Sequence, residues 1–396
     1  MRRERPAIVA GLARRFGDLE LAEDCVQDAA AEALERWARE GEPANPAGWL
    51  VTTARRKALD RLRRQHLGDQ KLALLAATTD ETLTEPDDDR LALVFACCHP
   101  ALPRDQQVAL TLRSVCGLTT GEIAAAFLVS EPAMAQRLVR AKRSLRAGRV
   151  RFRVPDPDEI GDRLREVLAV IYLVFNEGWL ASSARVPERE ELVRESVALA
   201  DLLIRLMPRE PEALGLRALI AFHQSRAATR FASWGRLVLL AEQDRSHWDR
   251  AAITHGTSLL DRAIAMGRPG PYQIQAAIAA LHAGALSWEQ TDWRQIRLLY
   301  SRLDELAPSP VLRLNRAVAT RYVMGAEAAL AEVDREAEVL AGYRLLHSTR
   351  AALLRDLGRA EEAHAADARA YELAVNPAER DLLAERLSGE PPPGLA

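Results

Sequence analysis

The sequence of 396 residues is poor in aromatic residues, which make up 5% of it, and few of its runs alternate apolar with polar residues. A half-buried β-strand needs that alternation. Alanine, leucine, arginine and glutamate dominate instead, so we predict an all-α protein. A chain of this length has room for about two or three domains with substantial cores.

No apolar run is long enough to cross a membrane. The longest uninterrupted one, residues 167–175, is far shorter than the roughly 20 residues that span a bilayer. Near the N-terminus, Arg14 and Arg15 interrupt the apolar stretch before it reaches the length of a secretory signal. We therefore expect no membrane span, and the cysteine usage described next predicts a reducing, cytoplasmic compartment.

Cysteines are few, and their spacing fits neither a disulfide framework nor a CxxC pair. The four are Cys25, Cys97, Cys98 and Cys116. Although Cys97, Cys98 and His99 invite a zinc interpretation, adjacent cysteines point about 100° apart on a helix, and no second cysteine pair lies nearby. We predict buried, free cysteines, and neither a metal site nor a cofactor.

Three common catalytic signatures are also missing. The sequence has no glycine loop that cradles phosphate, no HExxH zinc motif and no serine nucleophile elbow. We therefore predict that the protein is not an enzyme. The formal net charge is only −2, so the binding partner must be inferred from local clusters of charge.

Composition divides the chain into four parts. Residues 1–66 form the first helical part, and residues 67–86 are predicted to be an acidic linker. Residues 87–154 form a second helical part. A long helical extension, residues 155–396, follows and is interrupted by prolines.

The first part is expected to contain three helices. One ends before Gly17, and the others cover about residues 19–39 and 46–64. Asp18 can cap the second helix, and Pro46 can occupy the first turn of the third. The spacing of these signals therefore predicts the helix boundaries as well as the fold class.

Residues 118–146 have the form of a helix-turn-helix. Thr119 followed by Glu122 is a capping box, which begins one helix. Ser130 can cap the next helix, with Pro132 in its first turn. One side of that second helix is apolar and carries Met134, Leu138, Ala141 and Leu145.

The opposite side of the same helix is polar and carries Gln136, Arg140 and Arg143. Residues 132–154 contain eight basic residues and no acidic one. A solvated amphipathic helix is the alternative. An unbalanced cationic face behind a short-turn helix pair is more typical of a recognition helix in the major groove of DNA.

The predicted helix of residues 46–64 has a similar asymmetry. Its apolar side carries Leu50, Val51, Ala54, Ala58 and Leu62. The other side carries Trp49, Thr53, Arg56, Lys57, Asp60, Arg63 and Arg64. Arginines can hold phosphates, and an exposed aromatic ring can stack on an unpaired base. Trp49 is explained equally well as a core anchor at the helix start.

Several segments closely resemble bacterial extracytoplasmic-function sigma factors. They are DLELAEDCVQDAAAEALERW, NPAGWLVTTARRKALDRLRR, DDDRLALVFACCHPAL and LTTGEIAAAFLVSEPAMAQRLVRAKRSLR. More narrowly, the chain resembles the subgroup with a long C-terminal extension related to tetratricopeptide repeats. This similarity continues through YLVFNEGWLAS, WDRAAITHG, GPYQIQAAIAALHA and PSPVLRLNRAVA, so it covers nearly the whole chain.

The resemblance implies a protein that directs core RNA polymerase to promoters through its regions 2 and 4. Region 2.2 would be the helix that carries Asp24, Gln27 and Asp28. In the family these positions dock on the coiled coil of the β′ clamp, and an acidic face suits a basic partner. The β flap would be the second polymerase contact, and promoter DNA the other partner.

The resemblance also assigns the two DNA-reading regions. Regions 2.3 and 2.4 would be residues 42–48 and the helix after them, which recognise the −10 element and trap a flipped base. Their candidate residues are Asn45, Trp49, Thr53, Arg56, Lys57 and Arg63. The family often has Asn where this chain has Arg56. Region 4.2 would read the −35 element with Ser130, Gln136, Arg137, Arg140 and Arg143.

The extension is predicted to be a helical-repeat array. Ala351, Gly358, Ala363 and Ala370 stand at the offsets where a tetratricopeptide repeat needs small residues, and residues 314–334 are a looser copy. Because a fused domain acts at high effective concentration, we predict that the extension contacts regions 2 and 4 and regulates them.

Polar residues interrupt the apolar helices of the extension. They are Asn176, Glu177, Gln273, Gln275, His282, Asn315 and Arg316. A buried polar network explains them at least as well as a ligand groove does. The sequence FNEG is expected to end a helix at Gly178.

A one-component transcription regulator is the alternative to a sigma factor. Such a protein would bind DNA alone through its helix-turn-helix and sense a ligand or a peptide with its repeats. The presence of two separate basic helices, in the order of regions 2 and 4, favours the sigma factor.

Overall fold

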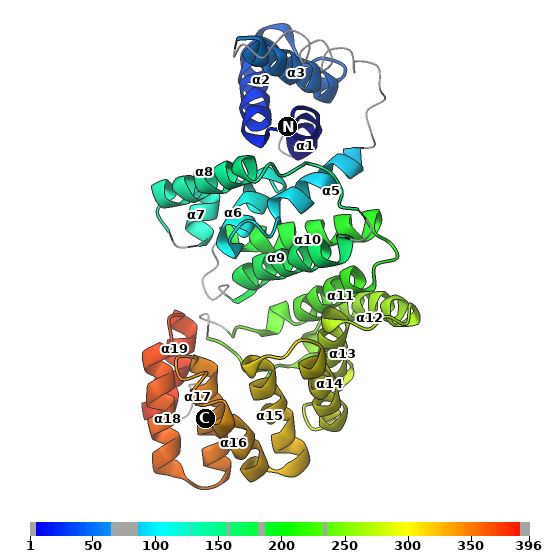
Figure 1. Ribbon diagram of the computed structural model, residues 1–396. Coiled ribbons are helices and arrows are strands. Elements are labelled where there is room, and N and C mark those ends of the chain that lie inside the picture. Colours follow the sequence, from blue (N-terminus) through cyan, green and yellow to red (C-terminus); the bar gives the residue numbers. More distant parts are fainter. Residues whose placement is uncertain are drawn as a thin grey trace. The chain divides into compact units, whose positions relative to one another are not determined.

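The structure is a computed structural model that describes residues 5–64, 86–127, 129–156, 159–180, 187–232 and 236–388. Across these ranges it contains 18 α-helices and one isolated β-bridge, between Phe231 and Leu237, which confirms the all-α prediction (Figure 1). The chain divides into two compact units. Unit 1 is Met1–Trp179 with Val186–Leu206, and unit 2 is Leu180–Arg185 with Met207–Ala396.

Unit 1 begins with the three predicted helices. They are α1 (Arg5–Phe16), α2 (Leu19–Glu40) and α3 (Pro46–Arg64). Gly17 makes the turn before α2 with a φ of +70°, a conformation that favours glycine. Asp18 then caps α2, because its Oδ1 accepts a hydrogen bond from the backbone N–H of Leu21 at 3.0 Å. Asp18 therefore caps α2 and Pro46 begins α3, as predicted.

The second helical part of unit 1 contains α5 (Pro86–Cys97), α6 (Arg104–Ser114), α7 (Thr120–Ala126) and α8 (Glu131–Ala147). The capping box before α7 is confirmed. Thr119 N–H donates to Glu122 Oε2 at 2.6 Å, and Glu122 N–H donates to Thr119 Oγ1 at 3.1 Å. Ser130 caps α8 by accepting the N–H of Ala133 at 3.4 Å. The predicted acidic linker, residues 67–86, lies almost entirely outside the described residues.

The first two helices of the extension are α9 (Ile160–Leu180) and α10 (Pro187–Leu206). Both belong to unit 1, apart from the last residue of α9. Helix α10 packs against α5 and α7. Arg163 donates to the carbonyl oxygen of Phe95 at 2.5 Å, and Arg104 forms an ion pair with Glu166 at 3.0 Å. The extension was predicted to begin at Pro155, but unit 1 continues to Leu206. The start of the extension is therefore not the boundary between the units.

Helix α9 does not end at Gly178, so the interpretation of FNEG was wrong. It continues to Leu180. The physical reason is a stack of aromatic rings on one helix face, where Phe175 and Trp179 lie 5.6 Å apart and are both buried. Burial of the Trp179 ring outweighs the local cost of a glycine in the last turn.

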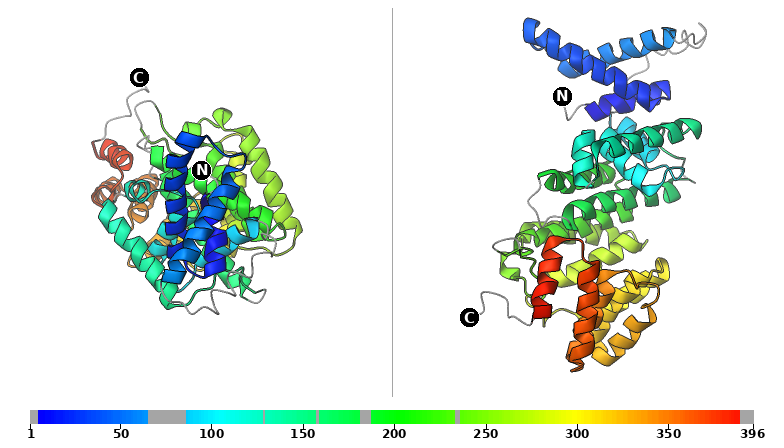
Figure 2. Two further views of the ribbon diagram at one scale, coloured as in Figure 1. Left: turned by 90° about the horizontal axis from the view of Figure 1, so that it is seen from above. Right: turned by 90° about the vertical axis from the view of Figure 1, so that its left-hand side faces the viewer.

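Unit 2 is a succession of helices in which each packs against the next (Figure 2). They are α11 (Pro211–Ser225), α12 (Arg250–Ala265), α13 (Pro271–Gly284), α14 (Trp293–Leu306), α15 (Pro310–Met324), α16 (Ala326–Arg335), α17 (Arg344–Asp356), α18 (Ala360–Leu373) and α19 (Pro377–Ser388). Contacts between sequence neighbours are the pattern of a helical-repeat array.

The small residues of the predicted repeat lie at helix contacts. Ala351 of α17 and Ala363 and Ala370 of α18 are buried. Gly358 makes the turn between these two helices with a φ of +71°. The offsets in the sequence therefore predicted the close packing of α17 and α18 correctly.

Several polar residues of unit 2 form hydrogen bonds instead of facing an open groove. Gln273 Nε2 donates to Glu212 Oε1 at 3.2 Å and to the carbonyl oxygen of Arg268 at 2.8 Å. Arg316 of α15 forms an ion pair with Glu332 of α16 at 3.3 Å. These contacts agree with the interpretation as a buried polar network. None of the described helices combines the length and the apolarity that a membrane crossing requires.

Candidate nucleic-acid interface

Helix α8 has an apolar side that is buried and a cationic side that is exposed. Met134, Leu138, Ala141 and Leu145 are buried against the rest of unit 1, as predicted. Gln136, Arg140 and Arg143 are exposed. Within the described residues, neither Arg140 nor Arg143 forms an ion pair. This face of α8 can therefore offer two arginines and an amide to a base edge or a phosphate.

The other two candidates on α8 are already engaged. Ser130 is the cap of the helix, so its hydroxyl oxygen accepts a backbone hydrogen bond. Arg137 is half-buried and pairs with Asp105 of α6 at 3.3 Å. In this structure the side chains of Ser130 and Arg137 therefore stabilise the helix-turn-helix. The other three candidates on α8 are exposed.

Helix α3 differs, because four of its six basic residues form ion pairs within the same bundle. Lys57 forms an ion pair with Glu32 of α2 at 2.7 Å, and Arg56 approaches the same carboxylate at 3.4 Å. The hydrogen bond from Lys57 lowers the pKa of Glu32 below its usual value. Arg63 is exposed and lies 3.4 Å from Asp60 of its own helix.

Thr53 was placed on the wrong side of α3. The helical wheel assigned it to the exposed face, but its exposed fraction is only 6%. The buried stripe of α3 includes Leu50, Thr53, Ala54 and Ala58. It is wide because α3 packs against both α1 and α2. Thr53 is therefore a packing residue in this structure and does not face DNA.

The start of α3 has a structural explanation for both of its candidates. Asn45 caps the helix, because its Oδ1 accepts the N–H of Gly48 at 2.9 Å. The half-buried ring of Trp49 packs edge-to-face on Trp37 of α2, with centroids 5.6 Å apart. This contact supports the role of a core anchor, although Asn45 itself is exposed.

The predicted polymerase-docking face of α2 is held by one arginine of α3. Arg61 donates to Asp24 Oδ2 at 2.9 Å and to Asp28 Oδ2 at 2.7 Å. Gln27 lies between them on the sequence and is exposed. The three residues therefore share an accessible surface, but both carboxylates already have a cationic partner.

An ion-pair contact that sequence reasoning missed joins the acidic start of α2 to α6 and α8. Glu23 is 5% exposed, accepts a hydrogen bond from Ser114 Oγ of α6 at 2.7 Å, and pairs with Lys142 of α8. Arg146, one turn further along α8, pairs with Asp18 at 2.9 Å and with Glu20 at 2.8 Å.

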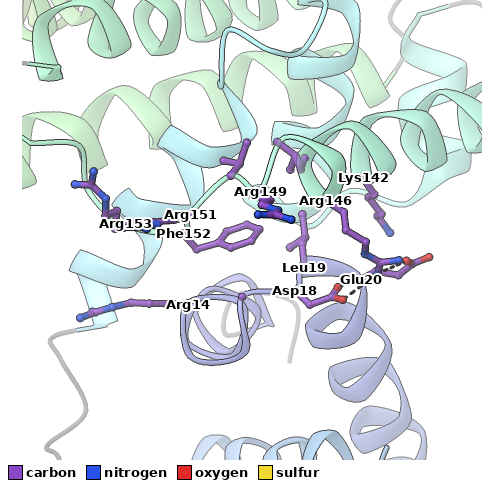
Figure 3. A pocket seen from close by; sticks show the side chains of 13 residues that line it. Arg14, Asp18, Leu19, Glu20, Lys142, Arg146, Arg149, Arg151, Phe152 and Arg153 are labelled. Carbon is purple, nitrogen blue, oxygen red and sulfur yellow. Dashed lines mark hydrogen bonds and ion pairs between the residues drawn. The ribbon is translucent and has the colours of Figure 1, made fainter. Parts of the chain in front are cut away.

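Figure 3 shows Arg146 reaching from α8 toward the carboxylates of Asp18 and Glu20 at the start of α2. The hydrogen bond with Asp18 raises the pKa of the Arg146 guanidinium, which stays charged in any case. We call this set of contacts, made by Asp18, Glu20 and Glu23 with Ser114, Lys142 and Arg146, the α2–α8 contact. No local signal could predict it, because Glu23 and Ser114 are 91 positions apart.

The cysteines are buried and free, as predicted. Burial raises the pKa of Cys97 well above its usual value and that of Cys98 to about 12, so both remain thiols at neutral pH. In the described part of the chain, no group of three or more His, Cys, Asp or Glu side chains is arranged to hold a metal ion.

Known families match both helical parts of unit 1. Residues 1–67 match sigma-70 region 2, and residues 92–145 match sigma-70 region 4. The chain belongs to the sigma-70 family. It is of the extracytoplasmic-function type, with region 2 at α1–α3 and region 4 at α5–α8, followed by a C-terminal extension.

The extension of this sigma-70 family protein also matches a known family. Residues 163–264, from α9 into α12, match a family of unknown function, DUF6596. A Rhizobium meliloti (strain 1021) protein, described only as uncharacterized, is 46% identical over 400 residues, which cover 98% of this chain and 95% of the relative. Sigma regions and extension therefore occur together in both proteins.

Sigma-70 regions 2 and 4 place the protein in promoter-specific transcription, with core RNA polymerase and promoter DNA as its partners in general. The free arginines on α8 and the ion-paired face of α3 then lie in the two regions of the family that meet DNA. The resemblance noted from sequence motifs is confirmed.

Proposed function

We propose that the protein is a sigma factor that binds core RNA polymerase through α2, reads the −10 element with the start and exposed face of α3, and reads the −35 element with α8. The observation that carries this proposal is the pair of cationic helices, α3 and α8, in two sigma-70 regions of one chain. Asp24, Gln27 and Asp28 would dock on the β′ clamp, and region 4 on the β flap. Its place of action would be the cytoplasm.

Promoter geometry requires region 2 and region 4 to separate. Elements centred at −10 and −35 are about 25 base pairs apart, which is about 85 Å at a rise of about 3.4 Å per base pair. In this structure Glu23 of region 2 and Lys142 of region 4 form an ion pair. A protein that keeps the α2–α8 contact cannot reach both elements, so the contact opens when polymerase and promoter bind.

We propose that the extension acts through its contacts with region 4. The pairs Arg104–Glu166 and Arg163 with the carbonyl of Phe95 attach α9 to the helices of region 4, and α10 packs on α5 and α7. A domain attached in this way stays at high effective concentration, so it can regulate without a separate inhibitor. These contacts support an extension that sets how freely region 4 moves.

Initiation with purified core polymerase tests the proposal. The full-length protein is expected to support transcription from a promoter that core enzyme alone does not use. The alternative, a one-component regulator, would bind a duplex operator tightly without polymerase and would not support initiation. Operator binding combined with no initiation on any promoter would therefore reject the sigma factor in favour of that regulator.

A further inference from the structure

A basic pocket of about 540 Å³ lies between the turn before α2 and the C-terminal end of α8 (Figure 3). Both walls belong to unit 1, one from region 2 and one from region 4 and the segment after it. Three buried apolar side chains, Leu19, Leu145 and Phe152, contribute to the lining beneath the charged groups. The pocket has the size of the sites that hold small organic ligands.

Most cations of this pocket are already paired. Arg146 pairs with Asp18 and Glu20, which are the only acids among the described residues of the lining. Arg14 pairs with Asp89 at 2.7 Å, and Arg153 pairs with Asp156 at 2.7 Å. Lys142 pairs with Glu23, as described above.

Two arginines of the lining, Arg149 and Arg151, lack such partners. Both are exposed, and within the described residues neither guanidinium group forms an ion pair or a hydrogen bond. They also line a second hollow of about 560 Å³ that shares Arg153 with the first. The second hollow also contains Glu159 and Asp162, but neither acid forms a described ion pair with Arg149 or Arg151. The two arginines therefore supply the unpaired positive charge of the first pocket.

The backbone holds Arg149 in an uncommon conformation. Its φ is +49°, and in the described chain no other residue except glycine has a positive φ. This conformation ends α8, because it lets the N–H of Val150 donate to the carbonyl oxygen of Leu145 at 3.0 Å. The formal net charge of −2 means that anions are not drawn to the protein as a whole, so any affinity must come from this local arrangement.

We propose that this pocket binds a phosphorylated small molecule of nucleotide size. Its phosphate groups contact Arg149 and Arg151, and its apolar body covers Leu19, Leu145 and Phe152. Arginine is well suited to this task because its planar donors bind phosphate oxygens in pairs. Asp18 and Glu20 on the opposite wall repel phosphate, which sets the orientation of the ligand.

Promoter DNA is the competing occupant, since Arg149 and Arg151 follow the recognition helix directly. A DNA duplex is too wide to enter a pocket of this volume. Its backbone could contact only the exposed Arg149 and Arg151 at the edge of the pocket. The apolar lining next to the arginines fits a compact ligand with an apolar part better than it fits a phosphate backbone.

The consequence for regulation rests on the proposed function. A ligand that touches both walls binds the arrangement in which region 2 and region 4 are in contact, and therefore stabilises it by mass action. Because promoter binding requires the two regions to separate, the ligand lowers occupancy of the promoter. The ligand is thus an inhibitor whose concentration the protein senses.

Direct titration of the full-length protein tests the binding site. Calorimetry uses ATP and GTP as probes, inorganic tripolyphosphate as a phosphate without an apolar body, and adenosine as a body without phosphate. Nucleotide binding is expected to weaken at least tenfold in Arg149→Gln/Arg151→Gln. The control Arg39→Gln/Arg294→Gln, two exposed arginines elsewhere, makes the same change in charge and is expected to bind normally.

The outcomes separate the possible ligands. Tripolyphosphate that binds as tightly as ATP and GTP removes the role of the apolar body and points to a polyphosphate. No binding of any phosphate at millimolar concentration overturns the site, as does an equal loss in the control variant. Arginine variants that weaken duplex binding, while the wild-type protein ignores nucleotides, assign these arginines to promoter DNA instead.

A second assay separates this inference from the proposed function. Assembly of a promoter complex with core polymerase is measured without RNA synthesis, with and without the bound nucleotide. The nucleotide is expected to lower assembly by the wild-type protein several-fold and to leave Arg149→Gln/Arg151→Gln unaffected. Nucleotide binding without any promoter complex contradicts only the sigma-factor proposal. A promoter complex that no bound phosphate inhibits contradicts only the regulatory role.

Discussion

Helices α3 and α8 both carry many arginines, yet their charges are used differently. On α3, Lys57 and Arg61 pair with acids of the neighbouring helix α2. On α8, Arg140 and Arg143 are exposed without a partner in the described residues, while Lys142 and Arg146 pair across to region 2. The face of α8 that we propose reads the −35 element is therefore exposed in this structure, whereas Lys57 and Arg61 of α3 would have to leave their acidic partners to contact DNA.

Among the changes that test this comparison, deletion of the extension is expected to have the largest effect, which is a loss of stability in region 4. A chain that ends at Val154 loses α9 and α10 and uncovers the parts of α5 and α7 on which α10 packs. Because full burial of one large aliphatic side chain contributes about 1.5–3 kcal/mol, we expect region 4 to lose about 3 kcal/mol or more. Thermal unfolding measures the loss.

A chain that ends at Leu206 is the matched control, because it keeps α9 and α10. Its unit 1 is expected to unfold near the temperature of the full-length protein. Equal destabilisation of both truncated chains would mean that unit 2, and not α9 with α10, supports region 4.

Replacement of Arg140 and Arg143 by alanine tests the free face of α8. Each contact of arginine with a base pair is worth about 1–3 kcal/mol, so we expect promoter affinity to fall about a hundredfold. Binding to core polymerase is expected to stay unchanged. Fluorescence anisotropy with promoter DNA and a polymerase pull-down give the two readouts, and a loss of polymerase in the pull-down contradicts the assignment.

The α2–α8 contact is tested by a charge swap. Glu23→Lys leaves Lys142 beside a like charge, and Lys142→Glu does the same to Glu23, so each single change is expected to cost about 3 kcal/mol. The double variant Glu23→Lys/Lys142→Glu restores opposite charges. Energy transfer between dyes on region 2 and region 4 is expected to fall in the single variants and to recover in the double.

Hydrogen bonding of Ser114 to Glu23 limits how far the swap recovers, since a lysine at position 23 no longer accepts that bond. Partial recovery is therefore the expected result. No recovery at all, with both single variants folded, shows that shape and not charge holds the two regions together.

Charge reversal on the docking face of α2 is expected to reduce polymerase affinity by about tenfold. Asp24→Arg/Asp28→Arg removes the acids that suit a basic partner and leaves Arg61 among like charges. Binding to isolated promoter DNA is not expected to weaken. Unchanged affinity for the β′ clamp in a pull-down would count against this face.

The smallest effect is expected at the ion pairs of α3. Lys57→Ala removes a partly exposed pair with Glu32, so stability is expected to change by less than about 1 kcal/mol. Chemical denaturation measures this change. A loss of several kcal/mol would show that the pairing of α3 with α2 is a main support of region 2, and the contrast between α3 and α8 would then be larger than described.

Local signals predicted the helices of unit 1 well. Asp18, Thr119 with Glu122, and Ser130 each cap the helix that the sequence assigned to them. A cap acts between residues that are close in the sequence, so a short pattern contains all the information. The apolar side of α8 was also predicted correctly, because its four buried residues recur at helical spacing and form one stripe, which packs against α6 and α7.

Contacts between distant segments could not be predicted in this way. Thr53 is buried because α3 has two neighbours, and a helical wheel does not show how many surfaces a helix meets. The partner of Glu23 is decided by how region 2 meets region 4, which no pattern near Glu23 encodes. Helix α9 passes Gly178 because the tertiary burial of Trp179 overrides the glycine.

Arg61 bonds to both Asp24 and Asp28, so the polymerase docking that we propose for this face would have to compete with a cation that is already present. A cation that takes over the Oδ2 atoms of Asp24 and Asp28 must displace Arg61, so a partner gains mainly from what it adds beyond one positive charge. Other basic proteins and polyamines would therefore have to compete with Arg61 for Asp24 and Asp28. On the proposed docking, selectivity would therefore come from the shape of the surface around Asp24 and Asp28, because Arg61 already balances part of their charge.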